Sequence, residues 1–215
     1  MATPTETLTL LQWLSPAYPV SAYAYSHGLE AAVDQGWVTD AESFKAWLSD
    51  VLTAGSGRSD ALFLAAAYHA QGAAALSRID DLARAFAPAR ERLLETDQQG
   101  AAFCRTTRAV SQPGLGDWVY PVALGSAAAQ EGLPLDLTQR SYLQAFVANL
   151  IAAAQRLLPL GQTEGQVMQH ALIPVYAEVA QATEHGDLDA LSGTTFLSDI
   201  AAMKHETQYS RIFRT

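Results

Sequence analysis

The residues near the C-terminus whose types could bind a metal are His205 and Glu206. A zinc protease of the His-Glu-x-x-His type needs a second histidine one helical turn later, so that both imidazoles reach the same ion. Position 209 is a tyrosine, and the motif is therefore incomplete. Imidazole and carboxylate are still ordinary metal ligands. Direct metal binding by His205 and Glu206, with a further histidine, is therefore one hypothesis for the chain.

A second chemical possibility is a serine hydrolase built on the adjacent residues Ser26 and His27. Neighbours in sequence do not face each other on a helix, and no Gly-x-Ser-x-Gly turn surrounds this serine. Ser26 is instead expected to cap the helix that contains Leu29 and Glu30. A small all-α hydrolase is thus the weaker hypothesis.

Other catalytic and cofactor motifs are missing from the sequence. The segment GSGRSD at 55–60 lacks the lysine and the preceding strand of a phosphate-binding loop. The five histidines are scattered, and the single cysteine, Cys104, lies among apolar residues where a buried thiol is expected. We therefore expect no cofactor, and one cysteine permits no disulfide within the chain.

The composition indicates a folded protein whose surface suits protein partners. Of 215 residues, 49% are hydrophobic and 16% are charged, with a net charge of −9. Nucleic acid is not an expected partner, because it requires clustered lysine and arginine. Lys204, Arg211 and Arg214 against Glu206 give residues 202–215 a net charge of +2, which leaves −11 on the remainder. Such a tail can fold back onto its own acidic body or reach for an acidic partner.

No membrane segment is expected in this chain. Residues 7–29 contain no Asp, Glu, Lys or Arg, but they include prolines and polar groups that hydrocarbon excludes. These are Gln12, Ser15, Pro16, Pro19, Ser21, Ser26 and His27. The N-terminus also lacks the basic region of a signal peptide. We therefore expect a soluble, cytoplasmic protein.

The elements that must position these residues are predicted to be helices. Alanine and leucine dominate, and alternating β-branched runs are absent. We expect an all-α, single-domain irregular bundle of about ten helices around a central apolar helix at 137–158. Residues 59–72 should be buried nearly all round, and residues 89–110 should form a long helix with a polar face.

Two helices begin with predicted capping boxes. In residues 39–55 we expect Thr39 to cap while Glu42 reaches back. Apolar residues then recur at three- and four-residue spacing and predict one buried face: Phe44, Trp47, Leu48, Val51 and Leu52. Thr163 and Gln166 form the second box, in a helix that Pro174 should kink or break.

Two polar or aromatic groupings leave alternatives open. Gln162, Gln166 and either Gln169 or His170 fall at helical spacing, which indicates a solvated face or a hydrogen-bonding surface for a partner. Periodicity alone favours the solvated face. Residues 15–30 contain three tyrosines between prolines, and these can either pack on the body or contact a partner.

Three segments resemble the motifs of the UreF family of urease accessory proteins. LLQWLSPAYPVSAYAYSHGLEAAVDQGWV at 10–38 is similar to the family's N-terminal motif. RLLPLGQTEGQ at 156–166 resembles its middle motif, and KHETQYSRIFRT at 204–215 its C-terminal motif. Their order and spacing span nearly the whole chain. One departure is Ser21, where the family usually has a glycine, a residue that permits backbone with φ > 0.

The resemblance implies an all-α adaptor without catalytic activity. UreF proteins bind the accessory protein UreD, called UreH in some organisms. They recruit and modulate the GTPase UreG, and they support nickel insertion into apo-urease. The resemblance also implies a homodimer. Direct nickel binding by His205 and Glu206 is the alternative role.

The resemblance also assigns partner-binding positions. It divides the chain into a UreF-like body, 1–203, and a docking tail, 204–215. The matching tail positions are His205, Glu206, Thr207, Gln208, Tyr209, Ser210, Arg211, Phe213 and Arg214. Glu30 closes the N-terminal motif. Gln162, Thr163 and Gln166 match the middle motif and are expected in the dimer or on the surface that faces the GTPase.

Overall fold

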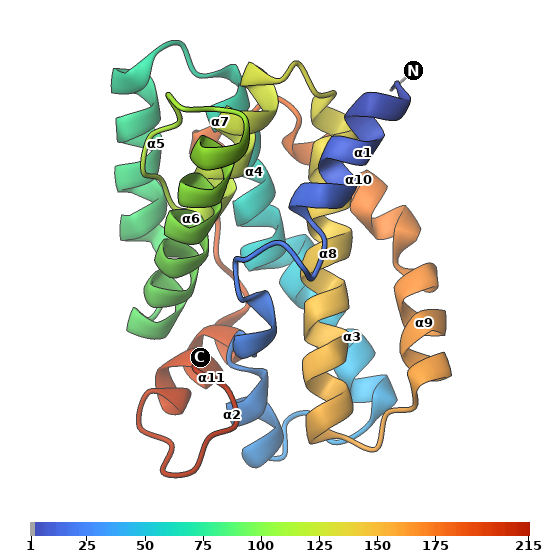
Figure 1. Ribbon diagram of the computed structural model, residues 1–215. Coiled ribbons are helices and arrows are strands. Elements are labelled where there is room, and N and C mark those ends of the chain that lie inside the picture. The colour runs from blue at the N-terminus through green and yellow to red at the C-terminus, as the bar shows by residue number, and fades with distance from the viewer. Residues whose placement is uncertain (1–2) are drawn as a thin grey trace.

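The computed structural model describes residues 3–215, which form eleven α-helices and two 3-10 helices with no strand among them (Figure 1). In chain order they are α1 (Pro4–Trp13), η1 (Ala22–Ala24), α2 (Leu29–Asp34), α3 (Ala41–Ala54), α4 (Ser56–His69), α5 (Ala73–Phe86), α6 (Arg90–Val110), α7 (Tyr120–Gln130), α8 (Leu135–Leu157), α9 (Gln162–Ala171), α10 (Ile173–Thr183), η2 (Leu188–Ala190) and α11 (Phe196–His205). The all-α prediction is confirmed.

The long helix α8 runs through the bundle and contacts α2, α3, α4, α7, α9 and α10 (Figure 1). It is the expected central helix. Helices α4 and α7 share the centre with it, because each buries residues on almost every side. These two helices approach closely at Gly125 of α7, where a Cβ atom would lie 2.1 Å from the Leu64 carbonyl oxygen. Only glycine fits at that crossing.

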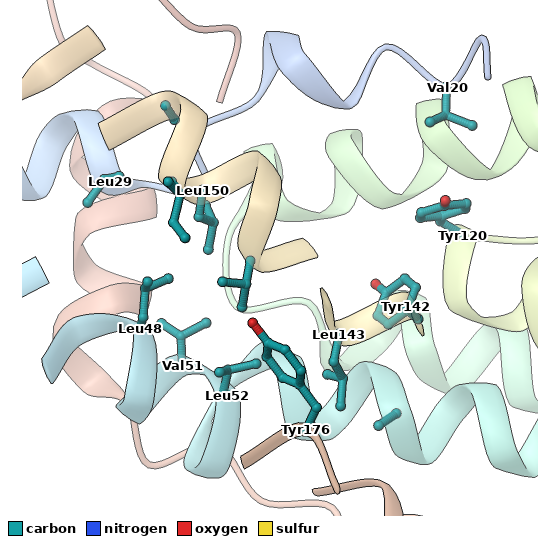
Figure 2. Packing of buried hydrophobic residues seen from close by; sticks show 14 of the residues in the cluster. Val20, Leu29, Leu48, Val51, Leu52, Tyr120, Tyr142, Leu143, Leu150 and Tyr176 are labelled. Atoms are coloured by element: carbon teal, nitrogen blue, oxygen red, sulfur yellow. The ribbon is translucent and has the colours of Figure 1, made fainter. Parts of the chain in front are cut away.

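Helix α3 contributes one apolar face to the core, as its residue spacing predicts. All five residues of that face are buried: Phe44, Trp47, Leu48, Val51 and Leu52. Figure 2 shows Leu48, Val51 and Leu52 grouped with Leu150 of α8 and Tyr176 of α10. Burying one such leucine stabilises the fold by roughly 1.5–3 kcal/mol, so this face is a main contributor to the core.

The expected cap of α3 is displaced by one residue. Asp40, not Thr39, is the N-cap, and its carboxylate accepts a hydrogen bond from the Ser43 amide at 2.9 Å. The Asp40 amide in turn donates to the Ser43 hydroxyl oxygen at 3.1 Å, so Ser43 replaces Glu42 as the returning side chain. Threonine and aspartate are both favoured as N-caps. Asp40 takes this position because its backbone is extended where the helix begins.

The second capping box is wrong, whereas the break at Pro174 is confirmed. Helix α9 begins at Gln162 with Gly161 as its N-cap, and no side chain accepts a hydrogen bond there. The helix therefore begins two residues too early for Thr163 to be its N-cap. Helix α9 ends at Ala171 and α10 begins at Ile173, which puts Pro174 in a first turn where its missing N–H costs nothing.

Candidate functional site

The C-terminal segment, residues 206–215, folds back across the N-terminal part of the chain. It follows α11, which packs against α2 and α6 at one end of the molecule (lower left in Figure 1). The Arg214 amide donates to the Ala24 carbonyl oxygen at 2.8 Å, and the Ser26 amide donates to the Thr215 backbone oxygen at 2.6 Å. A basic tail was expected either to fold onto its own acidic body or to reach for an acidic partner. In the structure it folds onto its own body.

Glu30, on the first turn of α2, holds this segment in place. Its Oε1 accepts a hydrogen bond from the Ile212 amide at 2.7 Å, and its Oε2 accepts one from the Phe213 amide at 2.9 Å. The His205 Nε2 lies 3.2 Å from the same Oε2. The structure therefore brings Glu30 of the N-terminal motif into contact with three residues of the C-terminal motif. Hydrogen bonds from amides to a buried carboxylate are among the stronger ones in proteins.

His205 is fully buried between two carboxylates. Its Nδ1 lies 2.6 Å from Glu91 Oε2 on α6, and the other Glu91 oxygen accepts a hydrogen bond from Arg211 at 2.7 Å. The Glu206 carboxylate points elsewhere and accepts from the Arg90 amide at 2.8 Å. Both imidazole nitrogens are thus occupied, and the described residues contain no group of three or more His, Cys, Asp or Glu side chains placed to hold a metal ion.

The remaining tail residues divide into an inner and an outer set. Phe213 is buried, and the Arg156 guanidinium lies 4.5 Å above its ring. Outward-facing tail residues are Thr207, Tyr209, Ser210, Arg211, Ile212 and Arg214, while Gln208 is half-buried. Tyr209 is fully exposed. The inner set anchors the segment, and the outer set is exposed on the described surface, although Arg211 also pairs with Glu91.

The outer face of α11 is apolar. Four of its residues are large, hydrophobic and between 42% and 68% exposed: Phe196, Leu197, Ile200 and Met203. Phe196, Ile200 and Met203 recur at three- and four-residue spacing, so they share one side of the helix. We use the name α11 patch for six exposed residues: Phe196, Leu197, Ile200 and Met203 of α11, and Tyr209 and Ile212 of the segment that follows it. Clustered exposed apolar residues are typical of interaction surfaces.

The middle-motif residues lie on a different part of the molecule. Gln162, Thr163 and Gln166 are all exposed on α9, which flanks α8 on the side away from α11 (Figure 1). The exposed Val167 and Ile173 lie in the same region of the chain. The structure therefore gives the predicted partner-binding residues two separate locations.

The N-terminal motif contains two residues in the left-handed backbone region. Ser21 has φ 57° and His27 has φ 59°. The glycine expected at position 21 would relieve strain there, and serine adopts the same conformation at a cost of about 1–2 kcal/mol. The N-cap of α2 is Gly28 and not Ser26 as predicted, but the Ser26 hydroxyl oxygen does accept a hydrogen bond from the Glu30 amide of the first turn at 3.4 Å.

The hydrolase hypothesis for Ser26 gains no support from the structure. The Ser26 side chain is completely buried, and its hydroxyl donates to the Thr215 backbone oxygen at 2.7 Å. Its neighbour His27 turns the other way and pairs with Ser56 at the start of α4. Ser26 is therefore a structural residue that ties the tail to the body.

Sequence reasoning missed the acidic face of α6. Glu91 and Glu95 are one helical turn apart, and both are buried. Glu95 pairs with Arg92 and accepts a hydrogen bond from the Thr215 hydroxyl at 3.0 Å. Burial would raise the pKa of Glu95, but the nearby Arg92 and His27 outweigh it and lower the pKa to about 2. The four-residue spacing of Glu91 and Glu95 places them on the same side of the helix, but the same spacing is equally typical of a solvated polar face.

A cavity of about 560 Å³ lies between α1, the segment 15–23, α6 and α8. Its walls are mostly apolar, and Tyr18 and Tyr23 line it. Arg92, Glu95 and the pair Asp60–Tyr142 add polar groups, with the Tyr142 hydroxyl donating to Asp60 at 2.7 Å. The segment 15–30 thus both packs on the body, through Tyr18 and Tyr25, and exposes Tyr23.

The fold and the site define an all-α protein whose buried carboxylates hold its C-terminal segment in place. A family model described as UreF matches residues 38–173. The chain is 54% identical to the urease accessory protein UreF of Ruegeria pomeroyi over the full length of both chains. It is 53% identical to that of Roseobacter denitrificans over 97% of this chain and 93% of the relative. The chain belongs to the UreF family of urease accessory proteins.

No helix within residues 3–215 is both long enough and apolar enough to cross a membrane.

Proposed function

We propose that this chain is an adaptor in urease maturation, working in the cytoplasm and supporting nickel insertion into apo-urease. In this role it binds the UreD/UreH-type accessory protein and recruits and modulates the UreG GTPase. Support comes from membership of the UreF family and from the three motifs that span the chain. The adaptor role requires surfaces for partners and no catalytic step of its own.

The observation that carries the proposal is the α11 patch beside the anchored tail. Binding a disordered segment costs conformational entropy, whereas a segment already held by Glu30 and Glu91 has lost most of that freedom. Tyr209 and Arg214 are residue types that dominate binding energy at interfaces. We assign the α11 patch, which includes Tyr209, together with Arg214 to the UreD/UreH-type partner.

The exposed side of α9 supplies a second surface. Gln162, Thr163 and Gln166 offer uncharged hydrogen-bonding groups, and Val167 adds apolar area that is 65% exposed. Because this surface lies away from α11, it can be occupied at the same time as the α11 patch. We assign it to the homodimer contact or to the GTPase.

Direct nickel binding by His205 and Glu206 is the less supported alternative. The His205 nitrogens face Glu30 and Glu91, and a metal would have to displace one of them. That displacement would break the contacts that hold the tail. The adaptor proposal needs no such rearrangement.

The test is co-purification with a tagged UreD/UreH-type protein. Tyr209→Ala and Met203→Ala remove exposed side chains without touching the buried anchors, and each should weaken binding by roughly tenfold or more. Val110→Ala is the matched control, because Val110 is 62% exposed at the end of α6 and lies outside the patch. Unchanged binding by both patch variants would overturn the assignment. Deleting residues 204–215 is expected to abolish binding too, but it also leaves Glu30 and Glu91 without their partners.

A further inference from the structure

Ser56, His27 and Glu95 lie side by side in an arrangement that the adaptor role does not use, with a Ser56–His27 hydrogen bond and the Glu95 carboxylate facing the other side of the ring. The Ser56 hydroxyl contacts the Nε2 atom of His27, and the His27 Nδ1 lies 3.6 Å from Glu95 Oε1. A hydroxyl on one imidazole nitrogen and a carboxylate facing the other is the arrangement that activates serine nucleophiles. Three separate elements supply the residues, so sequence spacing gives no sign of it.

The imidazole is placed to act as a base. His27 is 4% exposed, and its Nδ1 has no hydrogen-bond partner among the described residues, with Glu95 Oε1 3.6 Å away. A proton on Nδ1 would face Glu95 and leave the Nε2 lone pair toward the Ser56 hydroxyl. Burial, with Arg92 adding to it, lowers the pKa of His27 to about 4, so the ring is neutral at pH 7 and is a weaker base than a free imidazole; its position beside Ser56, not its basicity, supports the role. The left-handed backbone at His27 is a strained conformation of the kind found at functional sites.

Ser56 opens onto a pocket that can hold a small molecule. The pocket has a volume of about 250 Å³ and lies between the start of α4, the end of α5, the start of α6 and residues 193–199. Phe63, Phe86 and Pro121 give it apolar walls, while Arg92 and Thr96 add polar groups. Ser56 is also the first residue of α4, whose first-turn amides have no acceptor within the helix. Such amides can stabilise a developing oxyanion.

We propose that Ser56 is an activated nucleophile, with His27 as its base and Glu95 as the positioning residue, and that the pocket takes a short acyl ester. The Ser56 Oγ bonds to the carbonyl carbon while its proton passes to His27 Nε2. The C–O bond to the alcohol then breaks, and the alcohol leaves with that proton. Water next adds to the acyl-serine carbonyl, giving one proton to His27. The bond to Oγ breaks, Oγ takes up that proton, and the carboxylic acid leaves.

The experiment treats the folded full chain with a fluorophosphonate probe and locates the label by peptide mass spectrometry. In this reaction Oγ bonds to phosphorus, fluoride leaves, and His27 takes the hydroxyl proton. Ser56 should react on the order of 100-fold faster than exposed Ser210, since a positioned base contributes about that much. Ser56→Ala should remove the label, and His27→Asn and Glu95→Gln should slow labelling of Ser56. Ser49→Ala, at a half-buried serine of α3, is the matched control and should change nothing.

A purely structural hydrogen bond between Ser56 and His27 predicts a different result. Ser56 would then react no faster than Ser210, or equally fast in the folded chain and in urea, and either outcome overturns the proposal. The comparison with urea uses the unaltered chain, so it decides the question even if His27→Asn does not fold. Hydrolysis of p-nitrophenyl acetate is the second readout, and it should fall to background in Ser56→Ala. Binding to the UreD/UreH-type protein should survive that substitution, which separates this proposal from the adaptor role.

Discussion

The Glu30 carboxylate of α2 holds the C-terminal segment against the N-terminal part of the chain through three polar contacts. Its oxygens receive the amides of Ile212 and Phe213 and face the ring of His205. A glutamine at the same position keeps the shape but loses the charge, and it presents an NH₂ group to donors that need an acceptor. The residue therefore matters as an anion and not only as a long side chain.

We expect Glu30→Gln to lower the free energy of unfolding by about 2–4 kcal/mol, because it weakens charge-assisted hydrogen bonds in a buried site. Urea denaturation followed by circular dichroism measures this change. Glu42→Gln, on the exposed side of α3, is the control and should stay within about 0.5 kcal/mol. Equal midpoints for the two variants would mean that Glu30 does not hold the tail.

Single residues of this site were only partly predictable. Glu30 and the tail positions came from the resemblance, and Ser21 was expected at a position that favours φ > 0, which its φ of 57° confirms. Glu91 and Glu95 were not recognised, because a glutamate on a helix is normally solvated. Their burial depends on α11 and Thr215 covering that face, which is a long-range contact that local spacing does not encode.

At the scale of elements, the packing of α2 on α11 depends on Gly28. This residue has φ 77°, and a Cβ atom on it would lie 2.8 Å from the Ala202 amide nitrogen. Gly36, at the other end of α2, has φ 70° but nothing within 4 Å of its Cβ position. The two glycines therefore share a left-handed backbone conformation that would strain any other residue, and they differ in whether another helix lies against them.

Gly28→Ala should be the more destabilising of the two substitutions, by about 1–3 kcal/mol over Gly36→Ala. Both variants incur roughly 1–2 kcal/mol of left-handed strain, and only Gly28→Ala also pushes α11 away. Chemical denaturation of the two variants side by side measures the difference. Losses of equal size would show that α2 and α11 are not in close contact.

The sequence predicted helices better than it predicted their ends. The buried face of α3 and the break near Pro174 follow from periodicity and from the missing proline N–H. Thr39 and Thr163 were expected as caps and are not, because several capping residues stand together and the backbone selects among them.

At the scale of the whole molecule, buried titratable groups couple stability to pH. Burial lowers the pKa of His27 from 6.5 to about 4, so between these values the unfolded chain binds more protons. The free energy of unfolding therefore falls as the pH drops through that range. Glu95, with a pKa of about 2 instead of 4.5, extends the loss to lower pH. Asp60 acts in the opposite direction, because burial raises its pKa from 3.8 to about 6.

We expect His27→Asn to lose less stability than the unaltered chain between pH 7 and pH 4.5. Asparagine tolerates the left-handed backbone at this position and does not titrate. Urea denaturation at a series of pH values gives the change in the free energy of unfolding with pH for His27→Asn and for the unaltered chain. Asp60 is present in both proteins, so its contribution cancels in the comparison. His185→Asn is the control, since the His185 side chain is 87% exposed and its slope should match the unaltered chain. If the free energy of unfolding of His27→Asn changed with pH in the same way as that of the unaltered chain, His27 would not be a source of the pH dependence.

The central claim is that the tail is already ordered on its own chain and presents the α11 patch to a partner. Hydrogen–deuterium exchange on the full chain, alone and with the UreD/UreH-type protein, tests it most directly. The Ile212 and Phe213 amides should exchange slowly in the free chain because they donate to buried Glu30. The amides of residues 196–210 should exchange more slowly in the complex than in the free chain. Exchange of 206–215 at the rate of an unstructured peptide, or no gain over 196–210 on binding, would contradict the account.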